Sequence, residues 1–228
     1  MNGFAIALGQ FDGVHKGHQA LIKAAIAQAN SLGLSSSAML FDPLPRAVLF
    51  DGFKPLQMHR ERMSCMLSLG LNYIHEIKVD QAFIRKKPED FIQLLQRLSV
   101  QAIIVGDDFR FGYKRAGDIE LLARYFQVTV VPELAINGRR VSSTWCRELI
   151  QAYDFDGYRQ LVGRSWRASV EFLQGRAAKL PDILLPIGYE GQVSLGSESS
   201  IINCFANISS NDISLDLAIS GKADMIIN

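Results

Sequence analysis

Two histidines separated by a lysine and a glycine, His15 and His18, form the first pattern in this chain that could do chemistry. They end the stretch GQFDGVHKGH (residues 9–18), which stands between an apolar run typical of a buried strand and an alanine-rich segment typical of a helix. Residues three apart at a helix start can turn both imidazoles to one side. Gly17 leaves room for a ligand, and the helix start offers free N–H groups and a positive dipole end. Together these features predict a phosphate-binding site.

Two other interpretations of the histidine pair stay open at this point. Histidines near a helix start are often only polar surface residues. A zinc site is the second alternative, although no cysteine or acidic ligand stands at metal-ligand spacing nearby, so we expect no metal ligands from the protein.

Size and composition are those of an ordinary globular protein. The 228 residues, 48% hydrophobic and 21% charged, suffice for one large domain or for a medium domain and a small one. Seven acidic and three basic residues give the segment from Ala168 onward a net charge of −4, and the whole-chain charge of +1 leaves +5 for residues 1–167. Phosphate-rich ligands therefore belong with the front of the chain, whereas the excess is too dispersed to predict nucleic-acid binding.

Cysteine usage and hydropathy predict a cytoplasmic protein. The three cysteines, Cys65, Cys146 and Cys204, are odd in number and far apart, which fits reduced thiols. No apolar run approaches the roughly 20 residues of a membrane span. The N-terminus lacks the pattern of a signal peptide, so we expect no membrane partner.

Strand and helix signals alternate along most of the chain. They predict an α/β fold in which a parallel sheet is covered by helices on both faces. We expect strands at residues 4–8, 37–41, 73–79, 102–106 and 128–131, and helices at residues 19–32, 59–69, from 88 onward, 119–126 and 142–152. Ligands bind beyond the carboxyl ends of such strands. The histidine turn, a stiff non-helical connection at residues 42–46, the loop from Asp107 and the turn at Ser142 are expected to reach that edge.

After Trp166 the pattern changes. Helical periodicity fades, glycine and serine become frequent, and short β-prone segments appear at residues 168–173, 189–195 and 201–206. We expect a small β-rich domain here, joined to the first through residues 156–167. Residues 194–200 are rich in serine.

Four segments, in order and spacing, resemble one family. They are GQFDGVHKGHQALI, FDPLPRAVLF, VGDDFRFGYKRAGD and VSSTWCRELI, and residues 4–166 as a whole are similar to the adenylyltransferase module of the bacterial FAD synthetases, the bifunctional riboflavin kinase/FMN adenylyltransferases. The resemblance implies a Rossmann-like nucleotidylyltransferase domain at residues 1–160. It also implies a truncated riboflavin kinase-like β domain at residues 161–228.

The resemblance implies transfer of the adenylyl group of ATP to FMN, with Mg²⁺ held through the ATP phosphates. His15, His18 and Arg147 are its implied catalytic residues, since adenylyl transfer needs positioning and charge neutralisation. The implied ATP-binding residues are Gly9, Gln10, Phe11, His15, Gly17, His18, Ser142, Ser143, Thr144 and Arg147. The implied FMN-binding residues are Pro43, Arg46, Asp107, Asp108, Phe109, Arg110 and Phe111.

Simpler interpretations of the implied site residues remain open. The S-S-T segment could be only a helix N-cap, Phe109 and Phe111 could be core residues beneath a loop, and Arg46 could be a solvated surface residue.

The chain departs from the family pattern in two respects. Gln10 and Leu44 stand where many members carry other polar residues, which affects the detail of substrate contact. The P-T-A-N segment that supplies the kinase site is missing after Trp166, so we expect no riboflavin kinase activity. The alternatives are a transferase for another phosphorylated acceptor and a non-catalytic flavin- or nucleotide-binding regulator. In each case the partners are small molecules, with a homo-oligomer possible.

Overall fold

The computed structural model describes residues 3–196 and 201–228, which form two compact units. The first unit comprises Met1–Phe53 and His59–Val141, and the second comprises Lys54–Met58 and Ser142–Asn228. The chain therefore passes between the units twice before it enters the second for good. Along the chain, the boundary between the compact units falls after Val141, earlier than the domain limit that we expect after residue 160. That limit is implied by the family resemblance, and it stays a prediction.

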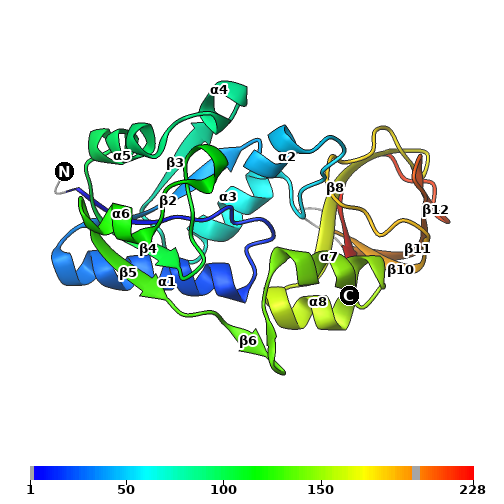
Figure 1. Cartoon of the computed structure of the whole chain (residues 1–228). Helices are drawn as coiled ribbons and strands as arrows, with labels where there is room; N and C mark the ends of the chain where they lie inside the picture. Colours follow the sequence, from blue (N-terminus) through cyan, green and yellow to red (C-terminus); the bar gives the residue numbers. More distant parts are fainter. Residues whose placement is uncertain (1–2, 197–200) are drawn as a thin grey trace. The chain divides into compact units, whose positions relative to one another are not determined.

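The first unit is built on a sheet of five parallel strands in the order β3-β2-β1-β4-β5 (Figure 1). These strands are β1 (Phe4–Ala7), β2 (Ser35–Asp42), β3 (Tyr73–Lys78), β4 (Val100–Gly106) and β5 (Gln127–Val131). The other elements are α1 (Lys16–Leu32), α2 (Pro45–Leu49), α3 (His59–Leu67), α4 (Gln81–Ile84), α5 (Pro88–Arg97), η1 (Tyr113–Arg115), α6 (Ile119–Ala123), β6 (Ala135–Ile136) and β7 (Arg139–Arg140). The predicted Rossmann-like α/β fold is confirmed.

Helices cover both faces of this sheet. Along β1, Ala5 and Ala7 pack on the face that carries α1 and Met66 of α3, whereas Ile6 packs on the face that carries Leu95 of α5. All five of these side chains are fully buried. Alternation along a strand places successive side chains on opposite faces, so this central strand contributes to two separate hydrophobic cores.

Helix α1 ends where the sequence predicts, at Leu32, and begins at Lys16, three residues before the expected start. His15 is its N-cap, and Gly33 ends it in the left-handed conformation with φ of 64°. Glycine adopts this backbone conformation without the steric cost that a Cβ atom brings. The same reasoning identifies the Asn137-Gly138 turn between β6 and β7, where both residues have positive φ.

Three local expectations were wrong. The connection at residues 42–46 is not wholly non-helical, because Pro45 begins α2, and proline suits the first position of a helix. Helix α6 ends at Ala123, three residues before the expected end. The expected joining segment at residues 156–167 instead contains α8 (Phe155–Val162), whose N-terminus is capped by the Asp154 carboxylate accepting from the Gly157 N–H at 2.8 Å.

The second unit combines α7 (Ser143–Gln151) and α8 with a closed antiparallel barrel in the order β10-β11-β12-β9-β8-β13. The strands are β8 (Trp166–Leu173), β9 (Arg176–Ala177), β10 (Tyr189–Gly196), β11 (Ile201–Ile208), β12 (Ile213–Leu215) and β13 (Gly221–Ile227). The small β-rich domain is confirmed, with β9, β12 and β13 in addition to the expected strands. Part of the serine-rich run, residues 197–200, lies outside the described residues.

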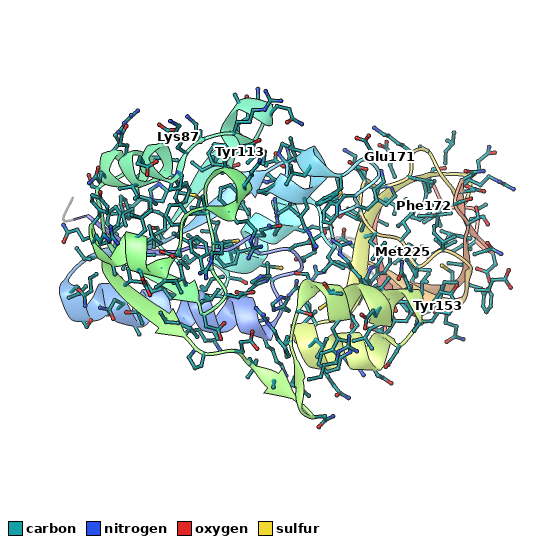
Figure 2. The ribbon with its side chains drawn as sticks, in the orientation of Figure 1. Lys87, Tyr113, Tyr153, Glu171, Phe172 and Met225 are labelled. Atoms are coloured by element: carbon teal, nitrogen blue, oxygen red, sulfur yellow. The ribbon has the colours of Figure 1, made fainter. Side chains whose placement is uncertain are left out.

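The barrel is filled by apolar side chains. Phe172 of β8 and Met225 of β13 are buried inside it, whereas Glu171, the neighbour of Phe172, is exposed (Figure 2). This alternation matches the period of a strand with one buried face. None of the helices in the described part of the chain is long and apolar enough to cross a membrane.

Candidate active site

The histidine turn leaves the centre of the parallel sheet. β1 lies between β2 and β4, and the strand order changes direction there, since the chain moves outward from β1 on one side and from β4 on the other. The turn after β1 contains the histidines, and the loop after β4 begins at Asp107. In open α/β sheets, ligands bind beyond the carboxyl ends of the strands at such a switch point. The sequence-predicted phosphate site therefore occupies the expected ligand position of this fold.

His15 is held at the start of α1 by its own role as helix cap. It is 6% exposed, and its Nδ1 accepts a hydrogen bond from the backbone N–H of His18 at 3.3 Å. A neutral imidazole whose Nδ1 accepts carries its proton on Nε2, so the ring can donate from that atom. A Cβ at position 17 would lie 3.2 Å from His15 Nδ1. Gly17 thus accommodates the His15 ring itself, in addition to the ligand access that we expected of it.

His18 stacks on His15, with ring centroids 3.7 Å apart and planes 16° apart. The expectation that both imidazoles face one side is confirmed. Burial, then the neighbouring His15 and then Arg62 lower the pKa of His18 well below its usual value, so the ring is neutral near pH 7. Its Nδ1 is buried and has no hydrogen-bond partner among residues 3–196 and 201–228. Such an atom is ready to bond to a ligand.

The backbone of the turn is strained in a way that fixes its shape. Phe11 and Val14 have φ of 51° and 40°, although neither is glycine, and both side chains are buried. Non-glycine residues in the left-handed region persist where surrounding packing holds them, and they are frequent at ligand sites. Asp12 between them is 4% exposed, which places a carboxylate inside the turn. Gly9 and Gln10, the other predicted ATP-binding residues here, precede this strained segment, and Gln10 is exposed.

A buried arginine beneath this turn was missed by the sequence reasoning. Arg62 of α3 is 2% exposed and donates from Nη2 to the carbonyl oxygen of Phe41 at 2.7 Å. Its Nη1 makes a longer bond of 3.4 Å to the carbonyl oxygen of Gln10. The available signal was its position four residues before Met66, because both lie on the buried face of the helix.

His59 joins the ends of two strands. Its Nε2 lies 2.6 Å from Glu76 Oε2 of β3, and its Nδ1 lies 3.6 Å from Asp42 Oδ1 at the end of β2. No local sequence pattern singles this residue out, because its partners lie 17 residues away on either side. They come near it only through the parallel register of the sheet.

The loop after β4 is tied to the β6–β7 hairpin by an ion pair. Arg140 Nη2 lies 2.8 Å from Asp108 Oδ2, and Arg140 Nη1 lies 2.5 Å from Glu133 Oε1. Burial lowers the pKa of Arg140, but the hydrogen bond to Asp108 and the charges of Asp108, Glu133 and Asp107 outweigh it and raise that pKa overall. Asp107 and Asp108, both predicted flavin contacts, are exposed, as is Arg110 beside them. Asp108 thus has a protein partner of its own.

The two phenylalanines of this loop lie in different surroundings. Phe111 is 6% exposed, packs against Phe91 at a centroid distance of 5.2 Å and pairs through its backbone with Gly117. Phe109 is only half-buried and stacks on Phe111 at 5.9 Å. Phe111 is therefore a core residue, whereas the Phe109 ring is partly exposed. Contact of either ring with flavin stays a prediction.

The loop after β2 exposes its predicted flavin residues. Pro43, which follows a cis peptide bond, and Arg46 are both exposed, and the Arg46 guanidinium lies 5.9 Å from the centroid of the Phe53 ring. Leu44, which stands where many family members carry a polar residue, is 3% exposed. It therefore packs inward here, and the nearby exposed polar group is Arg46 in the first turn of α2.

The S-S-T-x-x-R segment lies in the second unit. Ser142 Oγ accepts from the Trp145 N–H at 3.2 Å, so its hydroxyl caps α7, and Ser143 and Thr144 form the first turn. Arg147 Nη1 donates to the carbonyl oxygen of Lys54 at 2.6 Å. Ser142, Ser143 and Thr144 thus form the start of α7, with Arg147 in the same helix. Binding of ATP by this segment stays a prediction.

The protein groups needed for a metal site of its own are not clustered. Among residues 3–196 and 201–228, no three His, Cys, Asp or Glu side chains are placed to hold a metal ion. Cys65, Cys146 and Cys204 form no disulfide in the described part of the chain.

The buried histidines should make stability depend on pH. Burial also lowers the pKa of His75 on β3, as it does that of His18, so both rings are neutral when folded. In the unfolded chain they take up protons near pH 6.5, so the unfolded state binds more protons below that pH. We expect the free energy of unfolding to fall as the pH drops from about 7.5 to 5. Each histidine contributes at most about 1.4 kcal/mol per pH unit to this fall. Urea titrations of wild type and His75→Phe measure this, and equal pH slopes would contradict the role of His75.

A Rossmann-like sheet with stacked histidines at the switch point and an H-x-G-H helix start defines a nucleotidylyltransferase-type α/β protein. The family model for FAD synthetase matches residues 1–145. The chain belongs to the FAD synthetase family.

Similarity to named proteins supports this family membership. The chain is 38% identical over 162 residues to a protein of Geobacillus thermodenitrificans assigned as a bifunctional riboflavin kinase/FMN adenylyltransferase, covering 71% of this chain and 90% of that one. It is 32% and 30% identical to the bifunctional riboflavin kinase/FMN adenylyltransferases of Pseudomonas fluorescens and Escherichia coli, covering 76% of this chain. It spans 58% of the length of those two relatives.

A solved structure shares the fold. The crystal structure titled macrolide-efflux protein from Streptococcus pneumoniae matches with a TM-score of 0.86 at 20% identity, covering 99% of this chain and 84% of that one. At this identity the likeness concerns the fold alone.

Proposed function

We propose that this protein is an FMN adenylyltransferase that makes FAD and pyrophosphate from ATP and FMN. The observation that carries the proposal is the stacked pair His15 and His18 at the start of α1, at the switch point of the sheet. The family membership supports the same substrates. The helix start supplies backbone N–H groups and a positive dipole end for the triphosphate.

In the proposed reaction, a phosphate oxygen of FMN attacks the α-phosphorus of ATP in line. A P–O bond forms to the α-phosphorus while the bond from that phosphorus to the bridging α–β oxygen breaks, and pyrophosphate leaves with the electron pair. Positioning and charge neutralisation therefore supply most of the rate enhancement. Mg²⁺ bound to the ATP phosphates shares that neutralisation.

His18 is suited to a site whose charge changes when substrate binds. It is neutral in the free protein because of burial and of the nearby His15 and Arg62. An anionic phosphate close to an imidazole raises the pKa of the ring. His18 would therefore donate a hydrogen bond to the triphosphate, where negative charge develops on the leaving pyrophosphate.

The flavin would bind beside the loop after β4. Phe109 offers a partly open ring for the isoalloxazine system, and Asp107, Asp108 and Arg110 are exposed polar groups at its edge. Arg46, exposed in the first turn of α2, would hold the FMN phosphate. Ser143, Thr144 and Arg147 stay predicted ATP-binding residues.

Incubating the purified protein with ATP, Mg²⁺ and FMN, and measuring FAD and pyrophosphate, tests the proposal. Both products should appear in equal amounts and only when all three components are present. A parallel panel of other phosphorylated acceptors tests for a different specificity. Binding of FMN and ATP without any product would instead identify a regulator. The cytoplasmic location and a homo-oligomeric state remain predictions.

Changing the two loop phenylalanines should separate substrate contact from packing. We expect Phe109→Ala to raise the KM for FMN about 5- to 10-fold with little change in the KM for ATP, because it removes one aromatic contact. Phe111→Ala should instead lower the free energy of unfolding by about 3–5 kcal/mol, because Phe111 lies in the core. Steady-state kinetics and urea unfolding measure the two effects. A Phe109→Ala protein with a defect only in ATP affinity would show that the loop faces the nucleotide.

A further inference from the structure

Arg62 lies at the junction of two turns that the proposed reaction uses. Its guanidinium donates at 2.7 Å to the carbonyl oxygen of Phe41 near the end of β2 and at 3.4 Å to that of Gln10 in the histidine turn. A single side chain of α3 therefore holds the exits of two neighbouring strands. The planar fork of arginine suits such a bridge, because two of its nitrogens can bond to different acceptors.

Burying the charged Arg62 side chain costs free energy of folding, which suggests that the charge has a functional role. It is 2% exposed, and its Nε has no hydrogen-bond partner in the described part of the chain. Burial lowers the pKa of Arg62, and the carboxylates of Asp12 and Asp42 raise it. Arginine nevertheless keeps its charge in proteins. Buried ion pairs can often be replaced by packed apolar side chains without loss of stability, so structure alone does not explain a buried cation here.

The same charge acts on the histidine pair. His15 and Arg62 are the titratable groups that act on His18, and both disfavour its protonated form. His59, whose Nδ1 lies 3.5 Å from Arg62 Nη2, faces the guanidinium from the same helix. The cation thus lies beneath the turn at which the triphosphate is proposed to bind, within electrostatic reach of it.

We propose that Arg62 is a positioning residue of adenylyl transfer. It fixes the histidine turn and the end of β2 relative to each other, and it places a positive charge beneath the triphosphate. This inference rests on the proposed function. Arg62 acts through Gln10, Phe41 and His18 and touches no substrate itself.

Three variants test the proposal. Arg62→Gln removes the charge, Arg62→Lys keeps the charge but not the fork, and Arg60→Gln, on the exposed side of the same helix, is the matched control. We expect Arg62→Gln to lower kcat on the order of 100-fold, since small misplacement of reacting groups has effects of this size. The KM values for ATP and for FMN should change much less than kcat, because Arg62 is proposed to contact neither substrate directly. Arg62→Lys should recover part of the loss, and Arg60→Gln should match wild type.

A titration of the histidine rings by NMR gives a readout that does not need activity. In Arg62→Gln the pKa of His18 should rise, because one of the groups that lower it is gone, whereas Arg60→Gln should leave it unchanged. A merely structural role would leave the His18 titration as in wild type in a folded variant.

The outcomes separate this inference from the proposed function. If wild type makes no FAD from ATP and FMN, the proposed function fails, and an altered His18 titration in Arg62→Gln still identifies the charge coupling. If wild type is active and Arg62→Gln equals Arg60→Gln in kcat and in His18 titration, the inference is overturned. If neither Arg62→Gln nor Arg62→Lys folds, as judged by circular dichroism, Arg62 is purely structural and the inference is also overturned.

Discussion

Replacing His18 with alanine is expected to lower kcat for FAD formation about 100- to 1,000-fold, while FMN binding changes little. The ring stacks on His15 at the start of α1, and its Nδ1 is left without a partner in the part of the chain that the structure describes. Removal of one preorganised donor at developing charge typically has an effect of this size. Steady-state kinetics for both substrates and a direct FMN-binding titration measure it.

His75→Ala is the matched control for this substitution. His75 is also a histidine whose pKa burial lowers, but it lies on the edge strand β3, where its ring packs edge-to-face on Phe4 at 4.7 Å. Its loss should reduce stability and leave kcat near the wild-type value below the melting temperature. A His18→Ala protein with near-normal turnover would remove His18 from the mechanism. Equal losses in both variants would indicate a general effect of losing a buried ring.

The sequence predicts the first unit well because its signals are local. The strand–turn–helix pattern around residues 9–18 depends on hydrophobic periodicity, a glycine and a cap, all of which act within a few residues. Gly33 therefore ends α1, as expected, and the structure adds His15 as the N-cap of that helix. The same holds for Pro88, which begins α5 with Asp90 accepting from the Lys87 N–H at 2.9 Å.

What the sequence could not predict depends on partners that are distant along the chain. Arg62 is buried only because the ends of β1 and β2 place two carbonyl oxygens within its reach. The ion pair of Arg140 with Asp108 likewise joins residues 32 positions apart. Sequence reasoning can find the reactive side chains within a turn. It cannot find the side chain of another element, such as Arg62 of α3, that supports the turn.

The limits of the second unit illustrate the same point. The structure places the segment Lys54–Met58 with the barrel, because the Leu184 N–H donates to the Pro55 carbonyl oxygen at 2.7 Å and Leu56 is fully buried. Lys54 also pairs with Asp182 at 2.5 Å. No local pattern in residues 54–58 indicates that they belong to the second unit, whereas the residues before and after them belong to the first.

The chain is expected to form no FMN from riboflavin and ATP. A kinase must hold Mg²⁺–ATP and place the riboflavin hydroxyl near a base within one rigid structure. From Ala168 onward the sequence has no P-T-A-N segment and no glycine-rich phosphate loop, and its net charge of −4 disfavours a triphosphate. The barrel interior is occupied by apolar side chains such as Trp166, Phe172 and Met225.

Riboflavin, ATP and Mg²⁺ are incubated with the protein, and FMN and FAD are separated by chromatography. The same preparation given FMN should make FAD, which shows that it is active, whereas the riboflavin reaction should stay at the level of the no-enzyme control. Activity from a contaminating kinase is recognised because the rate of FMN formation then does not scale with the amount of purified protein across preparations. FMN that accumulates in proportion to the protein, and still does so in His18→Ala, would show that the barrel retains a kinase site. It would then have to be built from exposed side chains such as Glu171, because the buried face of β8 is apolar along its whole length.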